Sequence, residues 1–169
     1  MNVPEVSPCE VRAATAADVP LLHTLICELA DYERLRDTVT ATPDDLQSAL
    51  FGPKPCVEAI IASVDGEPVG FALFLPNYST FLGQRGLYLE DLYVRPAARS
   101  RGVGRALLSR VAQTALERGW GRMEWAALDW NEPAIRFYEG LGARRMAEWR
   151  LFRLSGDALQ RVAQPASGT

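Results

Sequence analysis

The sequence has few residues of the kinds that build metal centres and disulfide frameworks. Its three cysteines, Cys9, Cys27 and Cys56, are odd in number, far apart and outside any CxxC pair. Such cysteines indicate neither a disulfide framework nor a zinc site, and they fit a reducing cytoplasm. The one histidine, His23, has no metal-ligating partner at useful spacing, so we expect it to be structural or exposed and expect no metal.

Long apolar runs and a strong net charge are also missing. No apolar run approaches the roughly 20 residues that span a bilayer, and the first residues lack the charged-then-apolar pattern of a signal peptide. The net charge of −3 provides no positive field for nucleic acid. The sequence therefore predicts neither a membrane nor a nucleic-acid partner, and a mildly acidic chain favours small cationic molecules.

The length is that of one domain. A chain of 169 residues buries roughly two-thirds of its unfolded surface when it folds. We expect a single domain over 1–169, with a core over about 9–163 and a frayed tail over 164–169.

The most informative stretch runs over 88–116. Its first part is rich in aromatic and branched residues and predicts a strand, which Arg95-Pro96 ends because proline cannot donate a ladder hydrogen bond. The glycine turn Gly102-Val103-Gly104 follows and opens a long amphipathic helix. A strand, a glycine turn and a helix in this order direct free backbone N–H groups and the positive helix end at one spot. This arrangement is typical of an anion-binding site.

Two common phosphate-binding motifs do not fit the turn. A Rossmann fingerprint needs a third glycine where this sequence has Leu107, and a P-loop needs Gly-Lys-Ser/Thr although the only lysine is Lys54. What is left is the pattern Arg99-x-x-Gly102-x-Gly104. Taken alone, this pattern favours a solvated basic loop, because many surface loops contain arginine and glycine.

Apolar periodicity along the chain predicts a mixed, mostly antiparallel sheet with helices on both faces, in the α/β (α+β) class. We expect strands over 10–14, 57–64, 69–75, 88–94, 123–128 and 150–154, with a hairpin turn over 65–68 and a polar connection over 78–86. We expect helices after the capping signals at 15–18 and 42–45, from 103 until Gly119, over 131–142 and over 155–163.

The layout and the arginine-glycine turn resemble the GCN5-related N-acetyltransferase (GNAT) superfamily, and within it the spermidine/spermine and thialysine N-acetyltransferases. The matching stretches span nearly the whole chain and lie over 12–18, 28–33, 88–91, 129–138, 142–143 and 149–152. The stretch from Trp130-Asn131 to Tyr138 is specific. The resemblance implies a GNAT-like fold, acetyl-CoA as cosubstrate, and a homodimer in which 149–154 is exchanged or paired across the partner.

The resemblance also implies where acetyl-CoA binds. Its diphosphate sits on the amides of the glycine turn, and its pantetheine arm lies along the central strand, in a gap before the strand at 123–128. The residues implied are Leu92, Tyr93, Val94, Arg99, Arg101, Gly102, Val103, Gly104, Arg105, Asn131 and Phe137. Asn131 also fits a helix N-cap, a role that does not exclude the first. Ser100 stands where glycine is common in the family, and we expect little effect if its φ is negative.

The reaction implied is direct acetyl transfer from a thioester to an amine. The ammonium must lose a proton to a base, and the departing thiolate needs a proton donor. By resemblance, Glu90 is the base and Tyr138 is the acid. The alternatives are that Glu90 acts through its charge alone and that Tyr138 is a core aromatic with a satisfied hydroxyl. Because successive strand residues point to opposite faces, we expect Glu90 and Asp91 to lie in different environments.

The amine substrate of such an enzyme would bind in an acidic, aromatic pocket. Its candidate residues are Tyr32, Glu33, Glu90, Asp91, Glu148 and Trp149, several of which also fit a plain surface role. Polyamine-acetylating relatives place an aspartate before the central strand, where this chain has Tyr78-Ser79-Thr80. We therefore favour a small lysine-like or thialysine-like amine over spermidine.

Two other classes of protein stay open. One is a protein or peptide N-acetyltransferase, which would require an open groove for its acceptor. The other is a non-catalytic acyl-CoA-binding module, which is disfavoured because Glu90 and Tyr138 are both present.

Overall fold

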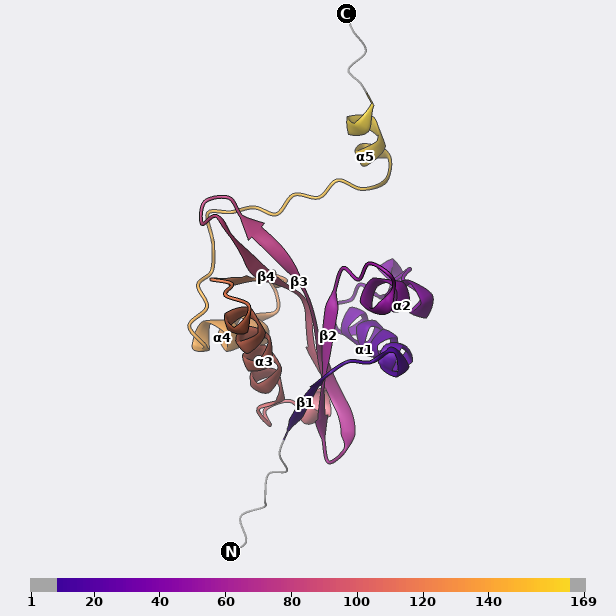
Figure 1. The fold of residues 1–169 in the computed structure, drawn as a ribbon, viewed down its shortest axis with the longest axis vertical. Helices are drawn as coiled ribbons and strands as arrows, with labels where there is room; N and C mark the ends of the chain where they lie inside the picture. The colour runs from indigo at the N-terminus through magenta and orange to yellow at the C-terminus, as the bar shows by residue number, and fades with distance from the viewer. Residues whose placement is uncertain (1–8, 165–169) are drawn as a thin grey trace, which may run out of the picture. The chain divides into compact units, whose positions relative to one another are not determined.

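The computed structural model describes residues 9–164, which form two compact units that divide between Leu128 and Asp129 (Figure 1). The first unit holds the sheet and the helices α1 to α3, and the second holds α4 and α5. The expectation of a single domain over 1–169 stays a prediction. Most of the tail predicted over 164–169 lies outside the described residues.

The first unit is built on one sheet with the strand order β1-β2-β3-β4-β5. Neighbouring strands from β1 to β4 are antiparallel, and β4 pairs with β5 in parallel. The strands are β1 (Glu10–Ala13), β2 (Glu58–Val64), β3 (Glu67–Ser79), β4 (Gln84–Val94) and β5 (Met123–Glu124). Helices α1 (Val19–Tyr32) and α2 (Pro43–Phe51) lie on one face and α3 (Val103–Glu117) on the other, which confirms the predicted fold class (Figure 1).

Local capping chemistry sets where the first two helices begin. Thr15 and Asp18 form the predicted capping box ahead of α1. Thr42 and Asp45 form a second one at α2, where the Asp45 N–H donates to Thr42 Oγ1 over 3.2 Å. Pro43 occupies the first turn of α2, where its missing N–H would have had no helical partner. Both helices therefore begin where the sequence predicts.

The core on the α1 face fixes that helix across the central strands. Leu22 and Leu25 of α1 are fully buried in one cluster with Ile61 of β2, Phe71 of β3 and Tyr93 of β4. Burial of each large apolar side chain contributes about 1.5–3 kcal/mol to stability. This packing brings the C-terminal end of α1 to β4, where the predicted acidic residues lie.

The prediction of a strand over 150–154 is wrong. These residues have no strand structure, and no strand among the described residues pairs with them. Leu151 and Phe152 are exposed. The branched and aromatic residues that suggested a strand favour one only when a partner takes up the backbone hydrogen bonds.

Two further predicted boundaries are also wrong. The strand predicted over 123–128 is confined to Met123–Glu124, because its pairing with β4 ends there. The connection predicted over 78–86 is shorter, because β3 continues to Ser79 and β4 begins at Gln84. Polar residues in this part of the hairpin continue the ladder, so polarity was a poor signal for a loop.

The second unit contains α4 (Glu132–Gly140) and α5 (Gly156–Ala163). The side chain of Asn131 accepts a hydrogen bond from the Ala134 N–H over 3.4 Å, which confirms the predicted N-cap. Helix α4 ends two residues before the predicted Gly142, which takes a φ of +92° just beyond the helix. Helix α5 follows Ser155 as predicted.

Candidate active site

The N-terminal end of α3 is arranged to hold an anion. Gly102 is the N-cap and has a φ of +80°, a conformation that glycine adopts without a Cβ clash. No side chain caps this helix, and its first turn holds no acidic residue. The N–H groups of Val103, Gly104 and Arg105 have no partner within the helix, whose first bond runs from Ala106 N to Gly102 O. These donors and the helix dipole fit a diphosphate.

Ser100 lies in the same turn. A serine in place of the family's glycine was expected to have little effect if its φ were negative, but its φ is positive. Its φ is +62°, which lies in the left-handed region. An L-residue there costs roughly 1–2 kcal/mol, so the turn that presents the N–H groups is strained at one position. Its neighbour Arg101 makes an exposed ion pair with Asp65, with 3.7 Å between the nitrogen and the carboxylate oxygen.

The edge of β4 that faces β5 is open over most of its length. The two strands pair only at Leu87 with Met123 and Tyr88 with Glu124. Beyond Tyr88, no strand among the described residues pairs with this edge, although the other edge of β4 continues to pair with β3 up to Val94. An extended chain with amide groups can add to such an edge as a substitute strand. The backbone of 92–94 therefore fits the predicted pantetheine contact.

A β-bulge interrupts β4 at its two predicted carboxylates, Glu90 and Asp91. In the ladder, Asp91 pairs with Leu73 and Leu89 pairs with Phe74, so Glu90 is the extra residue. Asp91 shares the face of Leu73, which belongs to the core cluster under α1. Leu89 shares the opposite face with Phe74, so regular alternation is broken at Glu90, which has no residue opposite it on β3. The prediction that Glu90 and Asp91 lie in different environments is confirmed, because Glu90 is exposed whereas burial raises the pKa of Asp91, although the bulge interrupts the regular alternation on which the prediction was based.

Glu33 joins these two residues to form an acidic cluster of three carboxyl groups, Glu33, Glu90 and Asp91. Burial raises the pKa of Asp91 to about 7, and the charges of Glu90 and Glu33 add to the effect. Burial also raises the pKa of Glu33, which directly follows α1. Glu90 is exposed. A carboxyl group whose charge is disfavoured by burial and by two acidic neighbours forms a site that a cation would stabilise.

Two aromatic rings connect the predicted cofactor and acceptor residues. The Nε–H of Arg99 donates to Val94 O over 2.9 Å. The guanidinium carbon of Arg99 lies 4.4 Å from the centre of the Tyr32 ring and 5.9 Å from that of Tyr93. Arg99 was predicted to bind the cofactor and Tyr32 to bind the amine. The cation–π pair between them therefore joins one predicted cofactor-binding residue to one predicted amine-binding residue.

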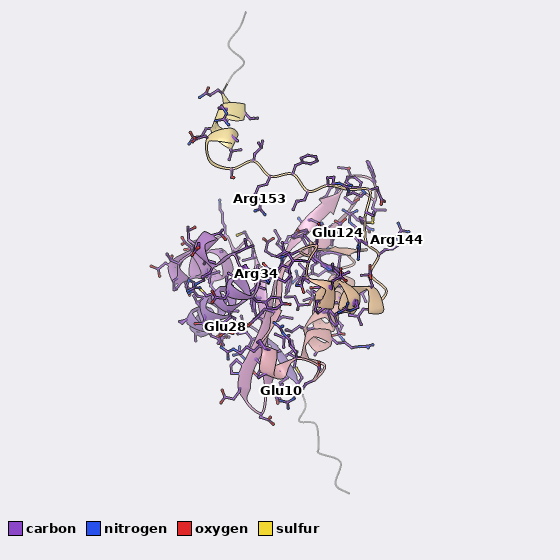
Figure 2. The ribbon with its side chains drawn as sticks, turned by 180° about the vertical axis from the view of Figure 1, so that it is seen from behind. Glu10, Glu28, Arg34, Glu124, Arg144 and Arg153 are labelled. Carbon is purple, nitrogen blue, oxygen red and sulfur yellow. The ribbon has the colours of Figure 1, made fainter. Side chains whose placement is uncertain are left out.

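Sequence reasoning missed an ion pair that ties β4 to α1. Arg95, read only as the end of a strand, donates from Nε and Nη2 to the carboxylate of Glu28 on α1 (labelled in Figure 2), at 3.0 and 2.8 Å. Its Nη1 donates to Pro68 O over 2.9 Å. The hydrogen bonds from Arg95 lower the pKa of Glu28, while burial raises the pKa of Tyr93. The sequence signal that could have predicted this contact is an acidic residue on a helix, Glu28, together with an arginine at the end of a strand that the helix covers, Arg95.

The other predicted site residues belong to the second unit. The rings of Phe137 and Tyr138 on α4 lie 5.3 Å apart at an angle of 55°. Asn131 is buried, whereas Glu148 and Trp149 are exposed. The roles predicted for these residues toward the cofactor, the leaving thiolate and the amine stay predictions.

Over residues 9–164 no group of three histidine, cysteine, aspartate or glutamate side chains is arranged to hold a metal ion. Within the same residues, no helix combines the length and the apolar character needed to cross a membrane.

The sequence and the fold of this chain are similar to those of known acetyltransferases. The model of the acetyltransferase (GNAT) family matches residues 23–143. L-ornithine N5-acetyltransferase NATA1 of Arabidopsis thaliana is 36% identical over 212 residues, covering 95% of this chain and 93% of that protein. Thialysine N-epsilon-acetyltransferase of Bos taurus is 39% identical over 164 residues, covering 90% of this chain and 96% of that protein. The integron cassette protein VCH_CASS6 of V. cholerae superposes with a TM-score of 0.76 at 26% identity, covering 93% of this chain and 98% of that one.

These matches define the class of protein: the chain is an acyltransferase that acts on an amine nitrogen. It belongs to the GNAT family of acetyltransferases, and acetyl-CoA is its cosubstrate. The resemblance noted from the sequence is confirmed. The open N-terminus of α3 and the free edge of β4 fit the diphosphate and the amide-containing arm of that cosubstrate.

The strain at Ser100 gives a first prediction. We expect Ser100→Gly to raise the free energy of unfolding by about 0.5–1 kcal/mol, because relief of the left-handed strain outweighs the entropy that glycine loses on folding. Ser109→Gly, in the middle of α3, is the matched control and should lower stability by a similar amount. Urea unfolding measures both. A loss of stability in Ser100→Gly would show that the turn is not strained.

The raised pKa of Asp91 gives a second prediction. A carboxyl group whose pKa is higher in the folded state favours the protonated form there, so stability falls as pH rises from about 4 to about 7. We expect Asp91→Asn to match the wild type near pH 4 and to exceed it at pH 8 by up to about 4 kcal/mol. Urea unfolding at a series of pH values tests this, with the exposed Asp37→Asn as control. Equal stability of Asp91→Asn and wild type at pH 8 would contradict the assignment.

Proposed function

We propose that the enzyme acetylates the side-chain amine of a small cationic amino acid of the lysine or thialysine type, in preference to a polyamine. The observation that carries this proposal is the acidic cluster at the β4 bulge, where Glu33, Glu90 and Asp91 lie near one another. The relatives reported above are named for acetylation of ornithine at N5 and of thialysine at Nε, each a side-chain amine of an amino acid. Three carboxyl groups that lie near one another can surround one terminal ammonium group, so the cluster fits a substrate with a single side-chain amine.

The acidic cluster binds the ammonium and takes its proton. An amine with a pKa of about 10.4 is protonated at neutral pH and must lose a proton before it attacks the thioester. Glu90 is the base, as the resemblance implies, and its exposure lets it pass the proton to water. Asp91 and Glu33 hold the ammonium through their negative charges.

Tyr138 donates a proton to the departing thiolate. This role is supported by the match of 129–138 to the family pattern and by the position of Tyr138 on α4, a helix that starts at a capped Asn131. The cosubstrate, when bound, supplies the acetyl group as a thioester. The residues that hold it are the backbone of 101–105 and the β4 edge over 92–94, with Arg99 placed by Tyr32 and Tyr93.

Spermidine is a weaker fit to the described acidic residues. A long polyamine carries several charges and is held best by several separated acids. The segment Tyr78-Ser79-Thr80 contains no acid, and Tyr78 is 62% exposed at the far end of β3. The acidic cluster near α1 therefore supports one ammonium rather than a row of them.

A homodimer in the cytoplasm completes the proposal. In the second unit, Trp149, Leu151 and Phe152 are 67, 77 and 90% exposed. A second copy of the chain would cover these apolar side chains, as the resemblance implies for 149–154.

The roles of Glu90 and Tyr138 give a third prediction. We expect Glu90→Gln and Tyr138→Phe each to lower kcat by about 10²–10⁴-fold, because each loses a proton-transfer group. Coenzyme A affinity, measured by calorimetry, should stay within about threefold of wild type, because both substitutions keep the size of the side chain and neither residue belongs to the α3 N-terminus. Glu10→Gln and Tyr78→Phe, at exposed positions, are the matched controls. Wild-type turnover in both variants would refute the assignments.

The acceptor preference gives a fourth prediction. Thiol release from acetyl-CoA should proceed with kcat/KM at least tenfold higher for thialysine, lysine or ornithine than for spermidine or a lysine-containing peptide. Glu33→Gln should raise KM for the favoured amine more than it lowers kcat, because Glu33 contributes charge to binding. If spermidine or the peptide were the best acceptor, the proposed substrate class would be wrong while the family assignment would stand.

A further inference from the structure

A second cluster of reactive side chains lies on α1, outside the proposed active site. It lines an open pocket of about 330 Å³ between α1 and the segment that leads into α2. The residues around the pocket are His23, Cys27, Arg36, Val39, Ala41, Thr42 and Pro43. A volume of this size accepts a small molecule.

The ring of His23 is oriented by a backbone carbonyl. Its Nε2 lies 2.9 Å from Ala41 O, which can only accept, so Nε2 carries the hydrogen. In the neutral ring, Nδ1 is then the acceptor, and it lies 3.9 Å from Cys27 Sγ. His23 and Cys27 are four residues apart on α1, which sets them side by side. A base oriented by a third group next to a thiol is the arrangement that activates a cysteine nucleophile.

Arg36 brings a positive charge to the same sulfur. Its contact with Cys27 raises the pKa of Arg36, with a smaller contribution from the charge of Asp31. Arg36 also makes an exposed ion pair with Asp31 at 3.8 Å. Cys27 is half-buried and lines the pocket. A partly exposed thiol in an electropositive setting is typical of a reactive cysteine.

The other two cysteines lack this setting. His23 is the only histidine in the sequence, and it contacts Cys27. Cys56 is exposed, and burial raises the pKa of Cys9. Cys56 is therefore an internal control for the reactivity of Cys27, because it is more exposed to solvent but has no histidine beside it.

We propose that Cys27 forms a mixed disulfide with a small disulfide that carries carboxylate groups, and that Arg36 binds a carboxylate of that molecule. His23 Nδ1 takes the thiol proton, and the Cys27 sulfur attacks one sulfur of the incoming disulfide. A new S–S bond to Cys27 forms, and the old S–S bond breaks. The departing thiolate takes the proton from His23, so the incoming disulfide is the oxidant and is itself reduced to one free thiol.

The test uses the full chain and glutathione disulfide as the anionic probe, followed by intact mass and peptide mapping at neutral pH. We expect one adduct, at Cys27, forming at least tenfold faster than any adduct at Cys56 and reversed by dithiothreitol. His23→Gln keeps a donor for Ala41 O but has no titratable nitrogen, so it should slow the reaction at least fivefold. Cys27→Ser should abolish the adduct.

The neutral probe bis(2-hydroxyethyl) disulfide tests the role of Arg36. Wild type should react faster with the anionic probe than with the neutral one, and Arg36→Gln should remove this preference. Acetyl transfer by each variant checks that the fold is intact. Equal rates at Cys27 and Cys56, or an unchanged preference in Arg36→Gln, would overturn the proposal.

Discussion

The account depends on one extra residue in β4. Because Glu90 has no partner on β3, the alternation of side chains breaks between Leu89 and Asp91, and the charge of Glu90 acts on the buried carboxyl group of Asp91. Burial and, to a smaller degree, the charges of Glu90 and Glu33 disfavour the charged form of Asp91, as its raised pKa shows. A positive charge near the bulge would therefore be stabilised, and in an N-acetyltransferase the ammonium group of the substrate can provide it. Beyond Tyr88, the edge of the same strand is unpaired by any strand among the described residues, and there we propose that the cosubstrate binds.

Contacts between α1 and β4 keep the two halves of the site together. The Glu28–Arg95 pair and the buried leucines of α1 hold the helix across the strand. Tyr32 and Glu33, at the end of α1, then reach Arg99 and Asp91 respectively. A change in the position of α1 would therefore affect the cofactor turn and the acidic cluster at once. Cys27, which lines the second pocket, belongs to the same helix, five residues before Tyr32.

Sequence reasoning succeeded where the signal is local. Capping boxes at Thr15 and Thr42, the Asp65-Gly66 turn and the glycine at the start of α3 each act through their own backbone, so a short window contains the cause. It failed where the cause is a partner elsewhere in the chain. The bulge at Glu90 is a matter of register with β3, and the strand expected over 150–154 lacked a partner. The positive φ of Ser100 is imposed by the turn rather than preferred by serine.

The most direct test of the account is the titration of the Asp91 carboxyl group, followed by carbon-13 NMR in the full chain without ligands. Asp91→Asn identifies the resonance. The account predicts a midpoint near pH 7 in the wild type and a lower one in Glu33→Gln, because one of the causes of the raised pKa is then removed. A wild-type midpoint near 4, the value of an ordinary aspartate, would show that the bulge does not gather the carboxyl groups and would contradict the account.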